Sequence, residues 1–386
     1  MNEREFPAYL LDQSISDRVN YFENYKFYHP KLKEVFKSVM NSIDKPGGAS
    51  IIMIIGPTGV GKTTLRLEIE KKLIEIALPE LIEDRGKIPV IGVEAVAPES
   101  GNFNWKDYYT RALIALEEPL IQHKISFDYN IPEIRRNSQG NILIKQSVAA
   151  NKLRQALENA LTHRRPDIFF IDEAHHLSKM SSGKKLEDQM DCIKSIANMT
   201  GVLHGLFGTY QMNVMHDLNS ELSRRTVNIH FPRYKLDNPK DFKAFLRALF
   251  TFQKHLPLNV EPDLVKRWDY LYERSLGCVG ILKDWLTRGL GYALEQKDNT
   301  MTEKHLRKQA MSVAQCERIL EQILEGEKYF AETQEKISKL RKSLGINPKL
   351  IEETSKNLSK PKKKSSRRVG KRKPKRDSIG VSQDAQ

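Results

Sequence analysis

The sequence predicts an α/β protein in which a parallel, doubly wound sheet is followed by a small all-α domain and a basic tail. Short apolar runs alternate with amphipathic helical patterns as far as Phe231. Only helical patterns follow Pro239, and apolar residues become sparse in the last segment of the chain. Alternation of strand and helix favours parallel pairing, because a parallel connection usually crosses the sheet through a helix.

Five apolar runs have the length and character of strands that are buried on both faces of a sheet. They are Ser50–Ile55, Ile88–Val96, Asp167–Ile171, Val202–Phe207 and Thr226–Phe231. Amphipathic helical patterns separate them, at Thr64–Leu78, Trp105–Glu117, Gln146–His163 and Lys185–Met199. Later helical patterns lie at Lys240–Gln253, Pro262–Ser275, Val279–Glu295 and Thr302–Ile323. The later group predicts a separate helical domain.

The predicted organisation has five segments. They are an N-terminal arm and first helix at 1–48, an α/β core at 49–236, a helical lid at 237–325, a charged helix at 326–349 and a disordered basic tail at 350–386. The tail is rich in Pro, Ser and Lys/Arg, so it has too little apolar surface to offset the entropy of ordering. It can bind nucleic acid non-specifically, dock on another protein or aid solubility.

Composition excludes a disordered or fibrous chain, because 39% of the 386 residues are hydrophobic. The net charge of +14 suggests a polyanionic partner, but it is unevenly placed. Residues 360–386 hold eleven Lys/Arg and two Asp, which leaves only +5 on the first 359 residues. The predicted folded body is therefore mildly basic.

The cysteine pattern and the apolar runs indicate the compartment. The three cysteines lie far apart and form no C-x-x-C pair, so a reducing, cytoplasmic setting is expected. The longest apolar stretch, Ser50–Ile55, is much shorter than the roughly 20 residues that span a bilayer. We expect neither a secreted chain nor a membrane protein.

A glycine-rich segment directly after the first predicted strand has the pattern of a phosphate-binding loop. Gly56-Pro-Thr-Gly-Val-Gly-Lys-Thr63 satisfies G-x-x-x-x-G-K-[ST] and opens a predicted helix. Glycines let backbone N–H groups approach phosphate oxygens, and the helix N-terminus favours an anion. Lys62 can reach the β- and γ-phosphates, and Thr63 can bind Mg²⁺. The predicted nucleotide contacts are Gly56, Pro57, Thr58, Gly59, Val60, Gly61, Lys62, Thr63 and Thr64.

Two carboxylates follow the third predicted strand, as the second half of such a site requires. Asp172 is expected to hold Mg²⁺ through water, and Glu173 to polarise the attacking water. His175 and His176 come next, but adjacent side chains project in different directions and cannot chelate one metal together. We interpret them as polar residues beside the site.

Two further candidate sites, Thr209 and the pair Arg224 and Arg225, each have a functional and a purely structural interpretation. Thr209 closes a predicted strand, where its hydroxyl can orient water or contact the γ-phosphate, or can simply belong to a turn. Arg224 and Arg225 precede the last predicted strand. They can project toward the nucleotide of a neighbouring subunit, where an arginine supplied in trans stabilises the transferring phosphate, or they can form a solvated helix end.

Taken in order, five segments resemble the motifs of the AAA+ ATPases, a group of P-loop NTPases. They are Gly56–Thr63, Ile171-Asp-Glu-Ala174, Phe207-Gly-Thr209, Ser223-Arg-Arg-Thr226 and Gly277-Cys-Val-Gly280. Within that group the chain looks most like the TnsC/TniB transposition regulators. This narrower resemblance rests on Tyr28-His29-Pro30, the Ile-Asp-Glu-Ala-His strand end, the Phe-Gly-Thr segment and the Gly-x-x-Gly-x-Leu helix start.

The resemblance implies an ATP- and Mg²⁺-dependent ATPase that assembles as a ring or filament on double-stranded DNA. It would link a target selector of the TniQ/TnsD type to a transposase, for which the tail is a candidate docking segment, and hydrolysis would control disassembly. It also implies that Thr209 is sensor one and that Arg224 and Arg225 provide the arginine finger.

The resemblance points to a basic segment for the DNA contact, although a lysine in a polar loop can also be merely solvated. The candidates are Lys145, with Arg135, Arg136 and Lys124 upstream. Basic side chains there would bind phosphates without reading sequence.

One departure from the family pattern leaves other functions open. The lid motif usually has a basic residue where this chain has Ile281, and Lys283 is the nearest cation. A DNA-bound scaffold with structural ATP therefore stays an alternative. So does an origin-recognition or helicase-loader ATPase, although residues 327–386 are short and polar for the winged-helix domain that such proteins often add.

Overall fold

The structure is a computed structural model that describes residues 4–97, 103–118, 134–136, 142–144, 150–178, 183–213 and 223–346. The chain forms two compact units, Met1–Phe330 and Ala331–Gln386. The second unit contains one described helix, α14 (Gln334–Ser343). The remaining description concerns the first unit.

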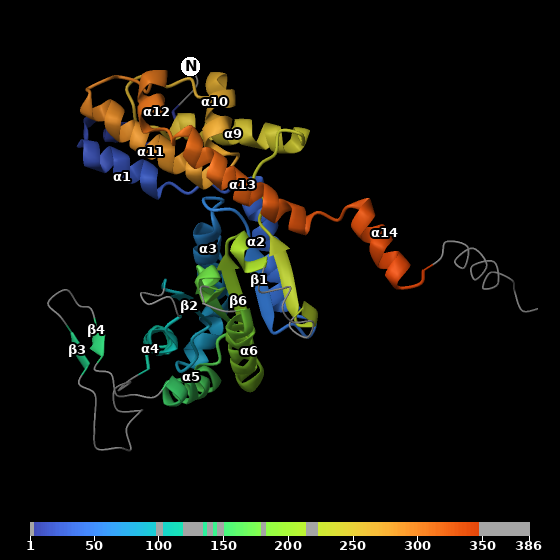
Figure 1. Cartoon of the computed structure of the whole chain (residues 1–386). Helices are drawn as coiled ribbons and strands as arrows, with labels where there is room; N and C mark the ends of the chain where they lie inside the picture. Colours follow the sequence, from blue (N-terminus) through green and yellow to red (C-terminus); the bar gives the residue numbers. More distant parts are fainter. Residues whose placement is uncertain are drawn as a thin grey trace, which may run out of the picture. The chain divides into compact units, whose positions relative to one another are not determined.

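A five-stranded parallel sheet with the order β2-β5-β6-β1-β7 lies at the centre of the α/β part (Figure 1). Its strands are β1 (Ile51–Ile55), β2 (Val90–Glu94), β5 (Ile168–Asp172), β6 (Leu203–Gly208) and β7 (Thr226–His230). All five predicted strands form, and the predicted fold class is confirmed. A separate antiparallel pair, β3 (Ile134–Arg136) and β4 (Ile142–Ile144), was not predicted.

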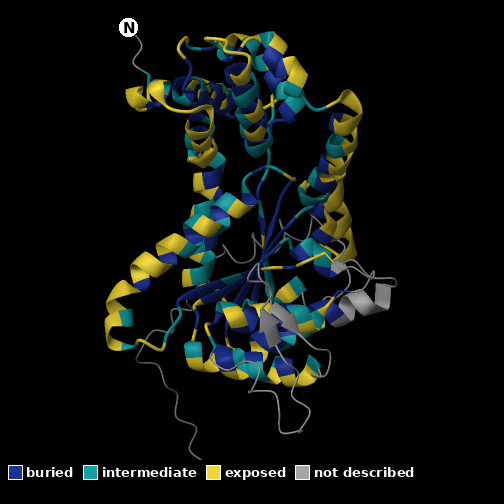
Figure 2. Cartoon of the chain, turned by 90° about the vertical axis from the view of Figure 1, so that its left-hand side faces the viewer, coloured by how far each residue is buried: buried dark blue, intermediate teal, exposed yellow. Residues whose placement is uncertain are grey.

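Helices cover both faces of this sheet. Alternate residues of β1 enter different hydrophobic clusters: Met53 joins the cluster with α4, α5 and α6, and Ile54 joins the cluster with α2 and α3. This two-sided burial explains why the strand is apolar throughout, and the strands are dark blue in Figure 2. The helices are α2 (Pro30–Asp44), α3 (Lys62–Glu83), α4 (Trp105–Ala115), α5 (Ala150–Arg164) and α6 (Gly183–Thr200).

The N-terminal segment divides between the two parts of the molecule. Helix α1 (Ile15–Asn24) packs on α11, and its Phe22 lies in the core of the helical part against Phe252. Helix α2 instead packs on β7 and α3. Tyr21, Tyr25 and Phe27 of the same segment also pack against the core of the helical part. A short 3₁₀ turn, η1 (Ala8–Asp12), precedes α1.

The helical part follows β7 and has its own hydrophobic core. Its elements are α9 (Pro239–His255), η4 (Val265–Arg267), α10 (Trp268–Ser275), α11 (Val279–Glu295), α12 (Glu303–Gln309) and α13 (Val313–Phe330). Where the sequence pattern predicts one helix over Thr302–Ile323, the structure has two, α12 and α13. The backbone N–H of Ser312 donates to the Gln315 side chain, and the backbone N–H of Gln315 donates to the Ser312 hydroxyl. This capping box stabilises the N-terminus of α13 as a separate helix.

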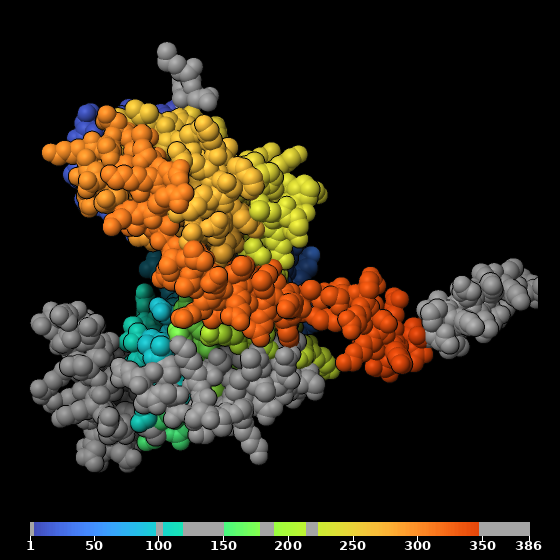
Figure 3. Space-filling model, turned by 45° about the horizontal axis from the view of Figure 1, so that its top comes forward, coloured from blue at the N-terminus to red at the C-terminus, as the bar shows by residue number. Residues whose placement is uncertain are grey.

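Helix α13 returns from the helical part toward the sheet. It contacts α10 at one end and η3 (Tyr210–Met212), directly after β6, at the other. Gly326 allows this approach, because a Cβ there would lie 2.0 Å from the Tyr210 ring. Figure 3 shows α13, in orange-red, across the boundary between the two parts. Among the helices that the structure describes, none is long and apolar enough to span a membrane.

Candidate functional site

The glycine-rich loop and the two carboxylates meet at one edge of the sheet. The loop follows β1, Asp172 ends β5, and Thr209 follows β6. Because these strands are parallel and adjacent, their carboxyl ends lie together, where ligands bind in open α/β sheets. The structure thus brings together the predicted residues of all three segments.

The loop holds the backbone in a form that only glycine adopts readily. Gly59 and Gly61 have φ values of +71° and +108°, and Gly61 is the N-cap of α3. Lys62 is buried and donates hydrogen bonds to the carbonyl oxygens of Gly56 at 3.1 Å and Pro57 at 2.9 Å. Burial lowers the pKa of Lys62, and the nearby Glu173 carboxylate opposes that shift.

Asp172 is the most enclosed carboxylate of the site, with 5% of its surface exposed. Its Oδ1 accepts a hydrogen bond from the backbone N–H of Glu173 at 2.9 Å. Its Oδ2 accepts one from Nε of Arg66 at 3.0 Å. The sequence analysis did not identify Arg66. The available signal was its place on α3, three residues after Thr63 and so on the same helix face.

Glu173 lies in a strained turn beside the two histidines. Its φ of +49° is rare for a residue with a side chain, and such strain often marks functional sites. Nδ1 of His175 lies 3.0 Å from Oε2 of Glu173. This contact lowers the pKa of Glu173. His175 therefore restrains the predicted water-activating carboxylate, a role that the interpretation as a neighbouring polar residue missed.

Thr209 faces the same edge. Its Oγ1 is buried and finds no hydrogen-bond partner in the part of the chain that the structure describes. A cavity of about 530 Å³ adjoins it, lined on one side by Pro57 and Thr58 and on the other by α13 residues such as Gln322 and Glu325. A buried polar atom without a protein partner fits a phosphate oxygen or water there. The sensor interpretation is compatible with this placement.

The helical part touches the loop through the first turn of α11. The backbone N–H of Gly280 donates to the carbonyl oxygen of Gly59 at 2.7 Å. A Cβ at Gly280 would lie 2.4 Å from that oxygen, so the approach requires glycine. Ile281 also packs on Gly59, whereas Nζ of Lys283 donates to the carbonyl oxygen of Glu23 on α1. Lys283 is thus engaged away from the loop.

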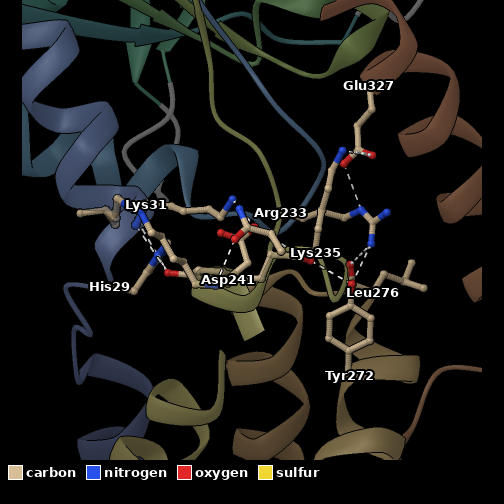
Figure 4. A network of polar contacts seen from close by, with 12 residues as sticks. His29, Lys31, Arg233, Lys235, Asp241, Tyr272, Leu276 and Glu327 are labelled. Atoms are coloured by element: carbon tan, nitrogen blue, oxygen red, sulfur yellow. Dashed lines mark hydrogen bonds and ion pairs between the residues drawn. The ribbon is translucent and has the colours of Figure 1, made fainter. Parts of the chain in front are cut away.

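A polar network joins the linker after β7 to α13 (Figure 4). The carboxylate of Glu327 lies 3.1 Å from Nε of Arg233 and 2.9 Å from Nζ of Lys235. Arg233 also donates to the Tyr272 hydroxyl at 3.1 Å and to the carbonyl oxygen of Leu276 at 3.3 Å. We call these five residues the joint, because they connect the sheet with the helical part.

Arg224 and Arg225 lie at the opposite edge of the sheet from the loop. They directly precede β7, whose first residue pairs in register with the first residue of β1. Arg224 is exposed, and Arg225 donates to the Asn198 side chain at 2.9 Å. A strand of five residues is roughly 17 Å long, so the loop of the same subunit lies a full strand away.

The predicted DNA contacts are mostly beyond the described part of the chain. Lys124 and Lys145 lie outside the described residues. Arg135 and Arg136 belong to β3, which pairs with β4, and only their backbone is described.

The residues present fit a nucleotide and a magnesium ion. Mg²⁺ commonly takes one or two protein oxygens together with phosphate and water, and Thr63 and Asp172 provide a hydroxyl and a carboxylate at this edge. The glycine loop and the N-terminus of α3 suit phosphate groups. Among the described residues, no cluster of three His, Cys, Asp or Glu side chains forms an all-protein metal site.

Comparison with known proteins agrees with this geometry. The sequence profile of the AAA domain matches residues 44–216. A search of curated protein sequences gives no match. Among solved structures, the chain is similar to the ORC2 protein of Aeropyrum pernix, with 15% identity over 77% of this chain and 72% of that chain and a TM-score of 0.46.

Two other structures are similar at comparable levels. The Walker-type ATPase of Pyrococcus abyssi is 15% identical over 84% of this chain and 80% of that chain, with a TM-score of 0.43. The Drosophila ORC structure bound to DNA is 11% identical over 80% and 68%, with a TM-score of 0.42. Because these TM-scores are low, the structural similarities are not used to infer a function. The match to the AAA domain and the geometry of the site are independent of them. Residues 44–216 thus match the AAA domain family, and their parallel sheet carries a glycine-rich loop of the kind that binds nucleotide phosphates.

Proposed function

We propose that this chain is an ATP-dependent regulator of DNA transposition that oligomerises on double-stranded DNA and couples a target selector to a transposase. ATP hydrolysis would control its disassembly. The observation that carries the ATPase part is the meeting of the glycine loop, Asp172, Glu173 and Thr209 at one sheet edge, beside the helical part.

Each side chain then has a chemical role. Lys62 would neutralise the β- and γ-phosphates, and the buried Oγ1 of Thr209 would hydrogen-bond a γ-phosphate oxygen or the water. Thr63 and Asp172 would hold Mg²⁺, which neutralises phosphate charge when bound. Glu173 would accept the proton of the attacking water, and His175 restrains its carboxylate.

The position of the two arginines supports assembly. Arg224 and Arg225 lie a strand length from the loop of their own subunit, so they can serve a nucleotide site only in a neighbouring copy. Each copy would offer a loop edge and an arginine edge, and such heterologous contacts generate rings or helical filaments. Repetition along an oligomer would also multiply weak phosphate contacts with DNA.

The narrower assignment to transposition rests on sequence likeness. Tyr28-His29-Pro30 opens α2, and Gly277–Gly280 opens α11. Both segments flank the joint: His29 Nδ1 lies 3.0 Å from the Tyr234 hydroxyl, and Gly277 accepts a hydrogen bond from the backbone of Tyr234. The features that suggest the TnsC/TniB type thus surround the contact between core and helical part.

Electron micrographs with an ATP analogue and random-sequence duplex DNA test the assembly. Rings or filaments are expected with both ligands, and particles that stay monomeric would contradict the proposal. Glu173→Gln should abolish multiple-turnover ATPase activity while it preserves ATP-dependent assembly. Glu75→Gln, on the exposed face of α3, is the matched control and should keep activity.

Mixing two inactive variants tests the arginine edge. Lys62→Ala keeps the arginines, and a variant with both Arg224 and Arg225 changed to Ala keeps the loop. Each alone should be inactive, and a mixture should regain turnover because one intact site forms between unlike subunits. Absence of any recovery would exclude an arginine supplied in trans.

Copurification from cells with a transposase rather than a replicative helicase separates the transposition proposal from the helicase-loader alternative.

A DNA-bound scaffold with structural ATP is the second candidate. The observation that favours it is Lys283, which contacts Glu23 on α1 while Ile281 occupies the position beside Gly59. A lid cation at the loop would aid phosphoryl transfer. Equal, background-level ATPase rates for the wild type and Glu173→Gln, with assembly intact, would support the scaffold.

A further inference from the structure

Arg66 on α3 reaches the carboxylate that we assign to magnesium. Its Nε donates to Oδ2 of Asp172 at 3.0 Å, and the two side chains are 17% and 7% exposed. Thr63, the other proposed magnesium ligand, stands one turn earlier on the same helix. Residues three apart share a helix face. Thr63 and Arg66 therefore both stand over the end of β5.

Arg66 has a second carboxylate within reach. Nη1 of Arg66 pairs with Oε1 of Glu70, one turn further along α3, and Glu70 is 18% exposed. Burial raises the pKa of Glu70, and the guanidinium of Arg66 opposes that shift. One guanidinium is thus shared between Asp172 and Glu70 in a partly enclosed place, where charge interactions are less screened than at the surface.

The neighbouring strand leaves room for this arrangement. Gly92 lies in β2, paired in register with Phe170 of β5. A Cβ at Gly92 would lie 2.3 Å from Oε1 of Glu70 and 2.5 Å from Nη1 of Arg66. A side chain at this position would displace the ends of Arg66 and Glu70, so glycine, normally unfavourable within a strand, leaves room for the pair. The edge strand β2 thus accommodates the contact between Arg66 and Glu70.

We infer that Arg66 is a positioning residue that competes with Mg²⁺ for Asp172, and that Glu70 receives the guanidinium when the metal binds. The inference rests on the proposed ATPase function. A guanidinium and a divalent cation draw on the same carboxylate and repel each other. Lys62 adds another cation nearby, so Asp172 alone cannot balance all of them. Glu70 then determines how readily Arg66 releases Asp172 to bind Mg²⁺.

The test measures how much magnesium strengthens nucleotide binding. Affinity for ATP carrying a fluorescent methylanthraniloyl group is measured in EDTA and in saturating Mg²⁺, and the ratio of the two Kd values is the magnesium factor. Arg66→Gln should raise this factor about three- to tenfold, because a competing charge-assisted hydrogen bond is lost. Glu70→Gln should lower it, because Arg66 then has only Asp172. Arg66→Lys should fall between wild type and Arg66→Gln.

The same helix offers matched controls. Lys72 and Glu75 form an exposed pair with the same charges, 49% and 47% exposed. Lys72→Gln and Glu75→Gln change net charge equally but should leave the magnesium factor unchanged. Glu70→Asp, which draws the carboxylate away from Arg66, replaces Glu70→Gln if that variant does not fold, and it should shift the factor in the same direction.

The outcomes separate the inference from the function on which it rests. Opposite shifts for the Arg66 and Glu70 variants support competition. Shifts in the same direction indicate a merely structural pair and overturn it, as does a factor that neither variant changes. Failure of the wild type to bind the ATP analogue in either buffer instead overturns the proposed ATPase function itself.

Discussion

The loop edge of the sheet and the joint with the helical part are built in different ways. At the loop edge, Asp172 ends β5, Thr209 follows β6, and Lys62 begins α3 after the loop that follows β1, so adjacent parallel strands and one short loop bring them together. At the joint, Glu327 meets Arg233 across 94 positions of sequence. The loop edge thus gathers the residues predicted to bind phosphate, and the joint connects the sheet with the helical part.

The two regions also differ in how they tolerate change. The loop depends on its own backbone geometry and on one buried ammonium group, that of Lys62. The helical part reaches the loop through the Gly280–Gly59 hydrogen bond and through the joint. Substitutions at the loop should therefore remove nucleotide binding, whereas substitutions at the joint should weaken closure and stability.

Lys62→Ala gives the largest expected effect and tests whether binding resides at the loop. Affinity for ATP should fall about 10- to 100-fold, because charge-assisted contacts to phosphate are lost. The melting temperature without nucleotide should not fall, since a desolvated cation is removed. Isothermal titration calorimetry and thermal unfolding measure the two quantities. A variant that binds ATP as tightly as the wild type would show that the loop edge is not the binding region.

Glu327→Gln tests the joint. The Glu327 side chain is 8% exposed and balances Arg233, which is 11% exposed. Its loss should destabilise the first unit by about 2 kcal/mol, since a partly buried guanidinium loses its carboxylate. The more exposed Lys235 adds little. Chemical denaturation measures the effect, and Glu325→Gln, exposed on the same helix, should be nearly neutral. Equal stability of the two variants would mean that this ion pair does not hold the joint.

The place of the loop-edge residues in the fold could be predicted from the sequence because the motifs that carry them are local. A glycine loop after an apolar strand, and a carboxylate at the end of another, specify their positions through the parallel sheet. Arg66 escaped prediction because its partner Asp172 lies 106 residues away, and only the packing of α3 on the sheet joins them. His175 was underestimated because the positive φ of Glu173 redirects the chain.

The joint could not be predicted from local pattern. Hydrophobic periodicity indicated helices after Pro239, but it does not say that α13 returns to the sheet or that α1 packs on α11. The Gly280 contact was closest to prediction, because the motif itself was recognised. The role of its glycine became clear only from the structure, where a Cβ at Gly280 would lie 2.4 Å from the Gly59 carbonyl oxygen.

Gly280→Ala tests the contact between the helical part and the glycine-rich loop. The added Cβ must push the first turn of α11 away from the Gly59 carbonyl oxygen, so ATP affinity should fall about tenfold, or about 1.4 kcal/mol. Gly291→Ala on the same helix is the control, because its Cβ would meet Val19 at an ordinary 3.8 Å. That control should bind ATP normally and gain up to about 1 kcal/mol of stability. Equal affinity of both variants would mean that the contact does not support binding.

Acidification gives the smallest expected effect and compares His29, which precedes α2 and contacts Tyr234 beside the joint, with the rest of the fold. Burial lowers the pKa of His29 to about 4, and Lys31 adds to the shift. The unfolded imidazole takes up its proton near pH 6.5, so stability is full above that pH and falls as pH drops toward 4. Between pH 7.5 and 6, His29 should account for about 0.8 kcal/mol of lost stability.

His29→Asn isolates this contribution because asparagine is also a good N-cap for α2, where Nδ1 of His29 accepts from the backbone of Leu32. Urea unfolding at the two pH values should show a smaller loss in the variant by that amount, and His163→Asn, on the exposed surface of α5, should leave the loss unchanged. An unchanged loss in His29→Asn would place the acid sensitivity elsewhere, with the buried His204 of the sheet as the next candidate. The surroundings of the joint would then be no more sensitive to protonation than the core of the sheet.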